Sequence, residues 1–172
     1  MKNNINDWID ILTDFLNQSK EGNLKTSQYP KEWSELRMRI SFGMGMPARV
    51  PWIAFIAPEM QVSKGFYPVY LYYKDLETLI LAYGISETTE FEKSWPAEIM
   101  NSTETISAHF DQDVPRYGNS FVFKAYKISI DNGTVKSSHK DSSSQGEERL
   151  KEEMGLRNDL GCGGGFKSST AD

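Results

Sequence analysis

The clearest structural signal in the chain is residues 66–73, which read Phe66-Tyr67-Pro68-Val69-Tyr70-Leu71-Tyr72-Tyr73. Aromatic and β-branched side chains dominate this stretch, and glycine or charged residues bound it, as is typical of a β-strand. Because successive strand side chains point to opposite faces, the odd-numbered residues 67–73 are predicted to share one face. Tyr70 and Tyr72 are then expected on the other face.

Working outward, four further stretches have strand character. Residues 36–42 alternate between apolar side chains and Arg37, Arg39 and Ser41, which predicts one buried face and one solvated face. The other predicted strands cover residues 51–56, 79–85 and 121–130. Residues 43–47 contain two glycines and end in a proline, which indicates a flexible loop with a rigid end.

Two helices are predicted outside these strands. In residues 5–19, apolar side chains recur in steps of three and four, which places them in one stripe on a helix: Ile5, Trp8, Ile9, Leu12, Phe15 and Leu16. Residues 105–110 predict a second, short helix. Strands and helices do not alternate regularly, so we expect an α+β fold. The predicted domain has a mixed, mainly antiparallel, curved sheet of four to five strands, flanked by helices.

The chain is expected to hold one domain, residues 1–130, followed by a tail, residues 131–172. The tail is rich in serine, glycine and charged residues, and we interpret it as polar and weakly ordered. Residues 147–160 have a thin apolar stripe that is compatible with a short helix.

Composition limits the classes of function. The net charge of −5 argues against a binder that coats nucleic acid without specificity, although Arg37, Arg39, Arg49 and Lys64 can still form a local basic face. The chain has one cysteine, no signal peptide pattern and no apolar run of the ~18 residues that a membrane span needs. These features predict a cytoplasmic protein that does not engage a membrane.

The common enzyme signatures are missing from the sequence. It has no glycine-rich phosphate-binding loop with a lysine behind it, and Cys162, His109 and His139 are too few for a zinc site. No lysine follows an acidic residue by two positions, which argues against a large class of Mg²⁺-dependent nucleases. We therefore expect a binding domain that is not an enzyme and that uses no cofactor or metal.

The aromatic residues suggest what is bound. Tyr67 and Leu71 are four residues apart and share one face of the predicted strand. Trp52 lies near the start of another predicted strand, beside the glycine-rich loop. Such side chains can line a slot for a flat ring, and a nucleobase turned out of a duplex is held in this way. Met44 lies between Gly43 and Gly45 and can fill the gap that the base leaves.

Several motifs, in one order, carry a family resemblance. They include Tyr29-Pro30, Ile40-Ser41-Phe42-Gly43-x-Gly45, Pro51-Trp52-Ile53-Ala54-Phe55, Gly65-x-Tyr67-Pro68-Val69-x-Leu71-Tyr72-Tyr73-Lys74-Asp75, Leu81-Ala82-Tyr83-Gly84-Ile85-Ser86 and Arg116-Tyr117-Gly118-x-Ser120. The chain closely resembles the amino-terminal DNA-binding domain of the McrB family. McrB is the specificity and GTPase subunit of the modified-cytosine-dependent McrBC restriction system.

The resemblance implies that the domain binds double-stranded DNA in which a methylated cytosine follows a purine, and that the cytosine is flipped. The family's base pocket corresponds to Trp52, Tyr67, Leu71 and Tyr117. The wedge that fills the duplex corresponds to Met44, where the family's best-known example has tyrosine. DNA-backbone contacts are expected from Arg37, Arg39, Ser41, Gly43, Gly45, Arg49 and Lys64. In a full-length family member, the partners are a GTPase motor and an McrC-type nuclease.

Two other readings stay open at this point. The same fold can read another base mark, such as hydroxymethylcytosine or N4-methylcytosine, which differs from 5-methylcytosine by one small group. The aromatic surface can instead serve a protein-interaction module that regulates a restriction complex.

Overall fold

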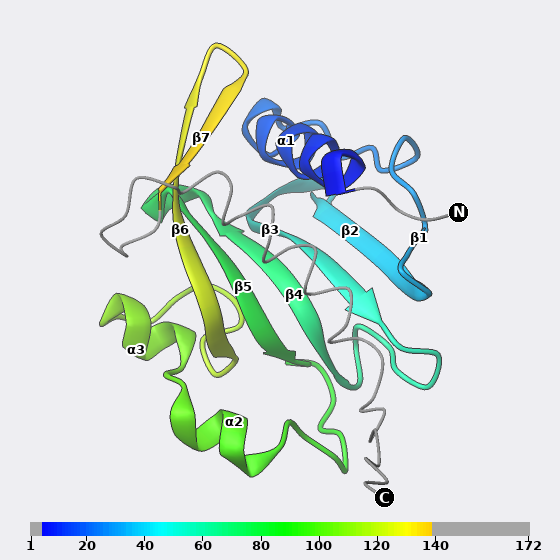
Figure 1. Ribbon diagram of the computed structural model, residues 1–172, viewed down its shortest axis with the longest axis vertical. Helices are drawn as coiled ribbons and strands as arrows, with labels where there is room; N and C mark the ends of the chain where they lie inside the picture. Colours follow the sequence, from blue (N-terminus) through cyan, green and yellow to red (C-terminus); the bar gives the residue numbers. More distant parts are fainter. Residues whose placement is uncertain (1–4, 139–172) are drawn as a thin grey trace, which may run out of the picture.

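The computed structural model describes residues 5–138, which form one seven-stranded sheet with helices packed against it (Figure 1). The strands lie in sequence order, and every neighbouring pair is antiparallel. They are β1 Glu32–Trp33, β2 Leu36–Met44, β3 Met46–Ile56, β4 Phe66–Tyr73, β5 Thr78–Ile85, β6 Phe121–Asp131 and β7 Thr134–Ser138. The α+β prediction is confirmed, but the sheet has more strands than the four to five predicted, and its strand pairings are antiparallel, not mixed.

The two strands beyond those predicted are β1 and β7. β1 is only two residues long. β7 pairs with β6 across a turn at Asn132 and Gly133, whose φ angles of 47° and 80° suit an Asn-Gly hairpin turn. The sheet therefore continues past residue 130 to Ser138, and the helix considered for residues 147–160 lies outside the described residues.

Residues 43–47, predicted as a loop, instead form the tip of the β2–β3 hairpin. Met44 of β2 pairs with Met46 of β3, and the pairing register shifts between Ser41 and Gly43. Gly43 has a φ of 122°, and a Cβ added there would lie 2.0 Å from the Met46 carbonyl oxygen. The chain can therefore fold back so tightly only with glycine at this position.

The predicted amino-terminal helix is confirmed as α1, Ile5–Glu21. Its apolar stripe buries Trp8, Leu12, Phe15 and Leu16. The helix ends before Gly22, which has a φ of 75° and so supplies the left-handed residue that commonly follows a helix.

The other helical elements are short. The second predicted helix is confirmed as α3, Ile106–Phe110, and the Thr105 side chain caps it by accepting a hydrogen bond from the Ala108 amide at 3.3 Å. A helix that was not predicted, α2 Ala97–Ser102, precedes it, and a 3₁₀ turn, η1 Lys74–Leu76, joins β4 to β5.

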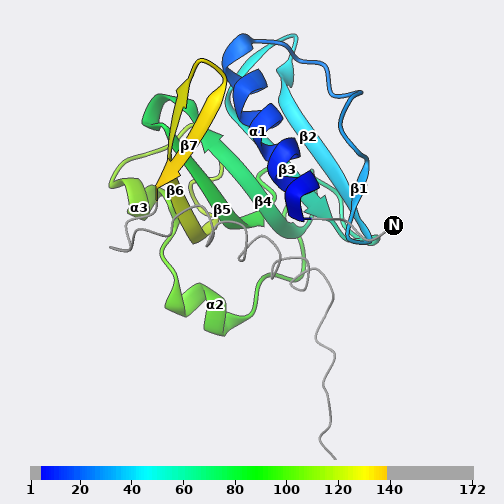
Figure 2. The same cartoon turned by 45° about the horizontal axis from the view of Figure 1, so that its top comes forward.

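The sheet has apolar residues on both faces, which divide the core in two. On one face, here called the α1 face, α1 lies across β2 and β3 (Figures 1 and 2). The ring of Trp8 packs there 5.3 Å from Trp33, 5.4 Å from Phe55 and 5.5 Å from Tyr70, measured between centroids. The other face, here called the opposite face, packs against Ile106 of α3.

The alternation predicted for β4 is confirmed by this division. Tyr67, Val69, Leu71 and Tyr73 are buried in the core of the opposite face. Tyr70 and Tyr72 are buried on the α1 face.

Candidate functional site

A row of directly paired residues crosses the middle of the sheet. Ser41 of β2 pairs with Trp52 of β3, Trp52 pairs with Leu71 of β4, and Leu71 pairs with Ile80 of β5. Directly opposed residues project their side chains to the same face of a sheet. The pairing therefore brings Trp52 and Leu71, both predicted site residues, side by side on the opposite face.

Tyr67 lies near the start of β4, on the same face as Leu71, beside a glycine of the neighbouring strand. It pairs with Gly84 of β5, where an added Cβ would lie 2.7 Å from the Tyr67 carbonyl oxygen and 2.7 Å from Val69 Cγ1. Tyr67 is only 1% exposed, and its hydroxyl donates a hydrogen bond to the Val62 carbonyl at 2.8 Å. Gly84 thus permits the close approach that encloses the ring.

Tyr117 reaches this cluster from the segment before β6. Its hydroxyl oxygen lies 3.2 Å from that of Tyr67, and its side chain is buried. Because the Val62 carbonyl can only accept, Tyr67 donates to it, and Tyr117 is the donor in the contact between the two hydroxyls. Burial raises the pKa of both tyrosines above the ordinary value, so both hydroxyls stay protonated further into the alkaline range than a free tyrosine.

The backbone of Tyr117 is held in an unusual conformation. Its φ of 60° lies in the left-handed region, which costs free energy for a residue with a large side chain. The Tyr117 amide donates to Glu87 Oε1 at 2.5 Å, and the Arg116 Nε donates to Glu87 Oε2 at 2.6 Å. The Tyr73 hydroxyl donates to the Arg116 carbonyl at 2.8 Å. These contacts fix the segment against the ends of β4 and β5.

The four predicted pocket residues therefore belong to one cluster. Because three of them are aromatic, it is here called the aromatic quartet: Trp52, Tyr67, Leu71 and Tyr117. All four contribute to the core of the opposite face, Trp52 being half-buried. The other three are each at most 2% exposed, so Trp52 is the member of the quartet that reaches solvent. A ligand can therefore touch all four residues only after side chains around them move.

Met44 has the opposite environment. It is 96% exposed at the tip of the β2–β3 hairpin, and Met46 beside it is 77% exposed. Large apolar side chains rarely project so far into water, so the tip is a prominent feature of the described surface. Gly45 between them has a φ of 72° and no atom within 4 Å of an added Cβ.

The predicted backbone-contact residues do not form one compact patch. Arg39 is exposed and pairs with Ala54, so it lies on the opposite face with Ser41. The Arg49 guanidinium forms an exposed ion pair with Asp75, 3.1 Å apart, beyond the end of β4. Lys64 is exposed before the start of β4, at the other end of that strand.

Arg37 has structural partners that the sequence does not reveal. Its guanidinium donates hydrogen bonds to the carbonyl oxygens of Met60 at 2.7 Å and Ala57 at 3.3 Å. It therefore holds the loop between β3 and β4 in place. Glu87, Val62 and Gly84 were also missed as neighbours of the quartet, since only the three-dimensional pairing brings them there.

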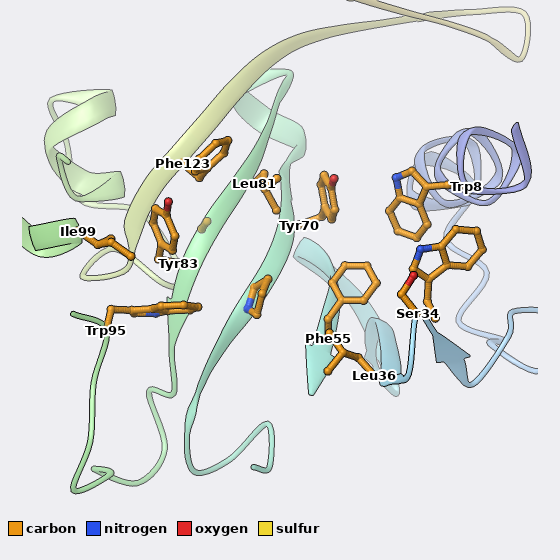
Figure 3. Close-up of a pocket in the computed structure, with 13 residues that line it drawn as sticks. Trp8, Ser34, Leu36, Phe55, Tyr70, Leu81, Tyr83, Trp95, Ile99 and Phe123 are labelled. Carbon is orange, nitrogen blue, oxygen red and sulfur yellow. The ribbon is translucent and has the colours of Figure 1, made fainter. Parts of the chain in front are cut away.

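A separate hollow lies on the α1 face (Figure 3). It is lined mainly by aromatic side chains, including Trp8, Phe55, Tyr83 and Trp95. No member of the aromatic quartet lines it, because the sheet separates the two.

No group of three or more histidine, cysteine, aspartate or glutamate side chains is arranged to hold a metal ion within residues 5–138. None of the helices described there is long and apolar enough to cross a membrane.

Comparison with known proteins agrees with the resemblance predicted from the motifs. Over 130 residues the chain is 35% identical to the "Type IV methyl-directed restriction enzyme EcoKMcrB subunit" of Escherichia coli (strain K12). The alignment covers 73% of this chain and 28% of that protein, so the chain corresponds to a minor part of its relative. Residues 7–161 match the model of a family described as "MrcB-like, N-terminal domain". This is an amino-terminal domain, in agreement with the prediction that the region is not itself an enzyme. The chain belongs to the family of MrcB-like N-terminal domains.

Proposed function

We propose that this domain binds double-stranded DNA as the specificity part of a cytoplasmic restriction system, and that it recognises 5-methylcytosine after a purine by flipping that base. The similarity to a protein named as a subunit of a methyl-directed restriction enzyme supports the general role. We assign GTP hydrolysis and DNA cleavage to partners, a GTPase motor and an McrC-type nuclease, because this sequence has neither a glycine-rich phosphate-binding loop nor a lysine two positions after an acidic residue.

The observation that carries the proposal is the convergence of the aromatic quartet. Trp52 and Leu71 are paired neighbours, and Tyr117 contacts Tyr67 from a distant part of the chain. A flipped base needs flat apolar walls, and stacking contributes roughly 1–3 kcal/mol per base. Unstacking the base costs a few kcal/mol, so a single well-formed pocket can offset most of that cost.

Selectivity for the methyl group needs a close fit as well as stacking. Burial of one methyl-sized group contributes about 0.8 kcal/mol, which is roughly a fourfold gain in affinity. A pocket shaped around the group discriminates by about 1–3 kcal/mol. Leu71 and Trp52 provide the apolar surface for the methyl group in this proposal, and the two tyrosine hydroxyls provide polar groups for the edge of the base.

The β2–β3 hairpin tip is assigned the role of the wedge. Met44 is 96% exposed, so it can enter a duplex without leaving a cavity in the protein. Methionine is unbranched and adapts to irregular gaps. Gly43 and Gly45 on either side keep side-chain bulk away from the DNA.

Phosphate contacts are assigned to residues around the quartet and the tip. Arg39 and Ser41 lie on the same face as Trp52, and Arg49 and Lys64 are exposed beyond the two ends of β4. Arg37 contributes to this surface through its loop contacts. With a net charge of −5, these few contacts predict a modest dependence of affinity on salt.

The test is binding to matched duplexes that carry one cytosine or one 5-methylcytosine after a purine, each at two salt concentrations. A preference for the methylated duplex that persists at the higher salt concentration supports the proposal. Equal, strongly salt-dependent binding contradicts base recognition and leaves a backbone binder. Absence of binding to either duplex contradicts DNA binding and favours the protein-interaction module. Duplexes with hydroxymethylcytosine or N4-methylcytosine identify the preferred mark.

A further inference from the structure

Glu87 lies just beyond the end of β5, and each of its two carboxylate oxygens accepts a hydrogen bond from a different partner. Oε1 accepts the hydrogen bond from the Tyr117 amide, at 2.5 Å. Oε2 accepts from Arg116 Nε at 2.6 Å. One side chain thus holds two consecutive residues of a segment that is 30 positions away in the sequence.

Tyr117 needs such support because of its backbone conformation. At a φ of 60° a bulky residue persists only where its surroundings hold it. A second tie acts nearby, since the Ile85 amide donates to Ser120 Oγ at 3.0 Å. The segment from Arg116 to Ser120 is therefore attached to the end of β5 at both of its ends.

Arg116 completes the arrangement around the ring. Its guanidinium carbon lies 5.3 Å from the centroid of the Tyr117 ring, within the range of a cation–π contact. The hydrogen bond to Glu87 raises the pKa of Arg116, so the guanidinium beside the ring keeps its positive charge. Glu87 thus positions both the backbone of Tyr117 and the cation beside its ring.

We propose that Glu87 is a positioning residue for base recognition, whose carboxylate sets the place of the Tyr117 ring in the aromatic quartet. This inference rests on the proposed function. Glu87 does not touch the base and acts only through Tyr117 and Arg116. Its loss therefore lowers the preference for the modified base more than it lowers binding to DNA in general.

The sequence offers a matched control three residues further on. Glu90 is exposed in the same loop, and Glu90→Ala removes the same charge. Removing either carboxylate reduces repulsion of DNA by a similar amount, so a difference between the two variants reports the contacts of Glu87. Glu87→Gln keeps an oxygen for the Tyr117 amide but loses the ion pair, and so is expected to fall between wild type and Glu87→Ala.

The experiment measures the affinity ratio between methylated and unmethylated duplexes for the wild type and these three variants. We expect Glu87→Ala to lower the ratio by about tenfold, since hydrogen bonds to charged groups are among the stronger ones, while Glu90→Ala leaves it unchanged. Equal ratios for Glu87→Ala and Glu90→Ala overturn the inference. Should Glu87→Ala not fold, Glu87→Gln takes its place, and a ratio equal to that of Glu90→Ala is then the contradicting result.

A second readout separates failure of this inference from failure of the proposed function. In the DNA-free protein, the Tyr117 amide proton is expected to exchange slowly with solvent and to lose that protection in Glu87→Ala but not in Glu90→Ala. A wild type without preference for the methylated duplex overturns the proposed function and, with it, the role of Glu87 in recognition. A wild type with preference whose Tyr117 amide exchanges equally in both variants overturns the positioning role alone.

Discussion

The hydroxyl oxygens of Tyr67 and Tyr117 lie 3.2 Å apart, although 50 positions separate the two residues in the sequence. Tyr67 is fixed in the middle of the sheet, whereas Tyr117 comes from the segment before β6. Their contact joins these parts of the chain within the core of the opposite face. In the proposed complex, the same two hydroxyls face the edge of the flipped base.

Trp52→Ala is expected to remove most of the preference for methylated DNA while leaving weak binding to either duplex. The lost stacking corresponds to about 1–3 kcal/mol, measured by fluorescence anisotropy with both duplexes. Phe55→Ala is the control, because Phe55 is also half-buried in β3 but packs on the α1 face against Trp8. An equal loss of preference in the two variants would contradict a pocket on the opposite face.

Met44→Tyr is expected to tighten binding and Met44→Ala to weaken it, each by about 1 kcal/mol or roughly fivefold, because a flat ring stacks better on bases than a thioether chain. The free energy of unfolding should stay within about 0.5 kcal/mol of wild type, since Met44 is 96% exposed. Met46→Ala is the control at the same tip. If Met46→Ala weakens binding as much as Met44→Ala, the tip has no single wedge.

Arg37→Ala is expected to lower the stability of the fold, whereas Arg39→Ala is expected to weaken binding to DNA. Arg37→Ala should lower the free energy of unfolding by about 1–3 kcal/mol, because the carbonyl oxygens of Met60 and Ala57 lose their donor. Arg39→Ala should leave stability unchanged and reduce the slope of log affinity against log salt by about 1, as expected for a phosphate contact. Urea denaturation and salt titrations measure the two effects, and a stable Arg37→Ala variant with the altered salt slope would reverse the assignment.

The buried Tyr29 hydroxyl is expected to make the folded protein less stable at alkaline pH. Burial, assisted by the Asp14 carboxylate, raises the pKa of Tyr29 from 10.0 to about 12. The folded state therefore holds the proton more tightly than the unfolded chain, so this contribution is complete below pH 10 and is lost as the pH rises from 10 to about 12. The slope reaches about 1.4 kcal/mol per pH unit for one such group.

Tyr29→Phe is expected to make that alkaline slope shallower without abolishing it, because burial also raises the pKa of Tyr67, Tyr73 and Tyr117. The variant also loses the hydrogen bond from Tyr29 to Gln18 Oε1, which costs about 1 kcal/mol at every pH. Urea denaturation across the window measures both effects. A slope identical to wild type would show that Tyr29 ionises equally easily in the folded and unfolded states.

The parts of the fold that follow from local periodicity were predictable. The two-residue period of β4 assigned Tyr67 and Leu71 to one face and Tyr70 to the other, and the structure agrees. β7 was not predicted because its residues are mostly polar, so the sequence shows no alternation of apolar and polar side chains there. The Asn132-Gly133 pair before it is nevertheless a recognised hairpin signal. The loop expected at residues 43–47 is hydrogen-bonded only because Gly43 permits close contact between the two strands.

The surroundings of the candidate site were less predictable, because they depend on contacts between distant residues. Arg37 was expected to face DNA phosphates, and no local pattern shows that the carbonyl oxygens of residues 57–60 receive its hydrogen bonds. Glu87 is one of many acidic residues in the sequence, and only the position of Tyr117 beside it reveals its contacts. Residue types indicated what the site can bind, whereas the partners of each side chain required the structure.

The methylated base is proposed to enter the aromatic quartet, and the most direct test is NMR of a duplex whose 5-methylcytosine carries a ¹³C-labelled methyl group. In the complex with wild-type protein, the account predicts an upfield shift of the methyl signal, caused by the surrounding rings, and cross-relaxation with ring protons of Tyr67 or Tyr117. A saturated complex in which the methyl signal keeps its free-duplex position, and cross-relaxes only with neighbouring bases, would contradict the account.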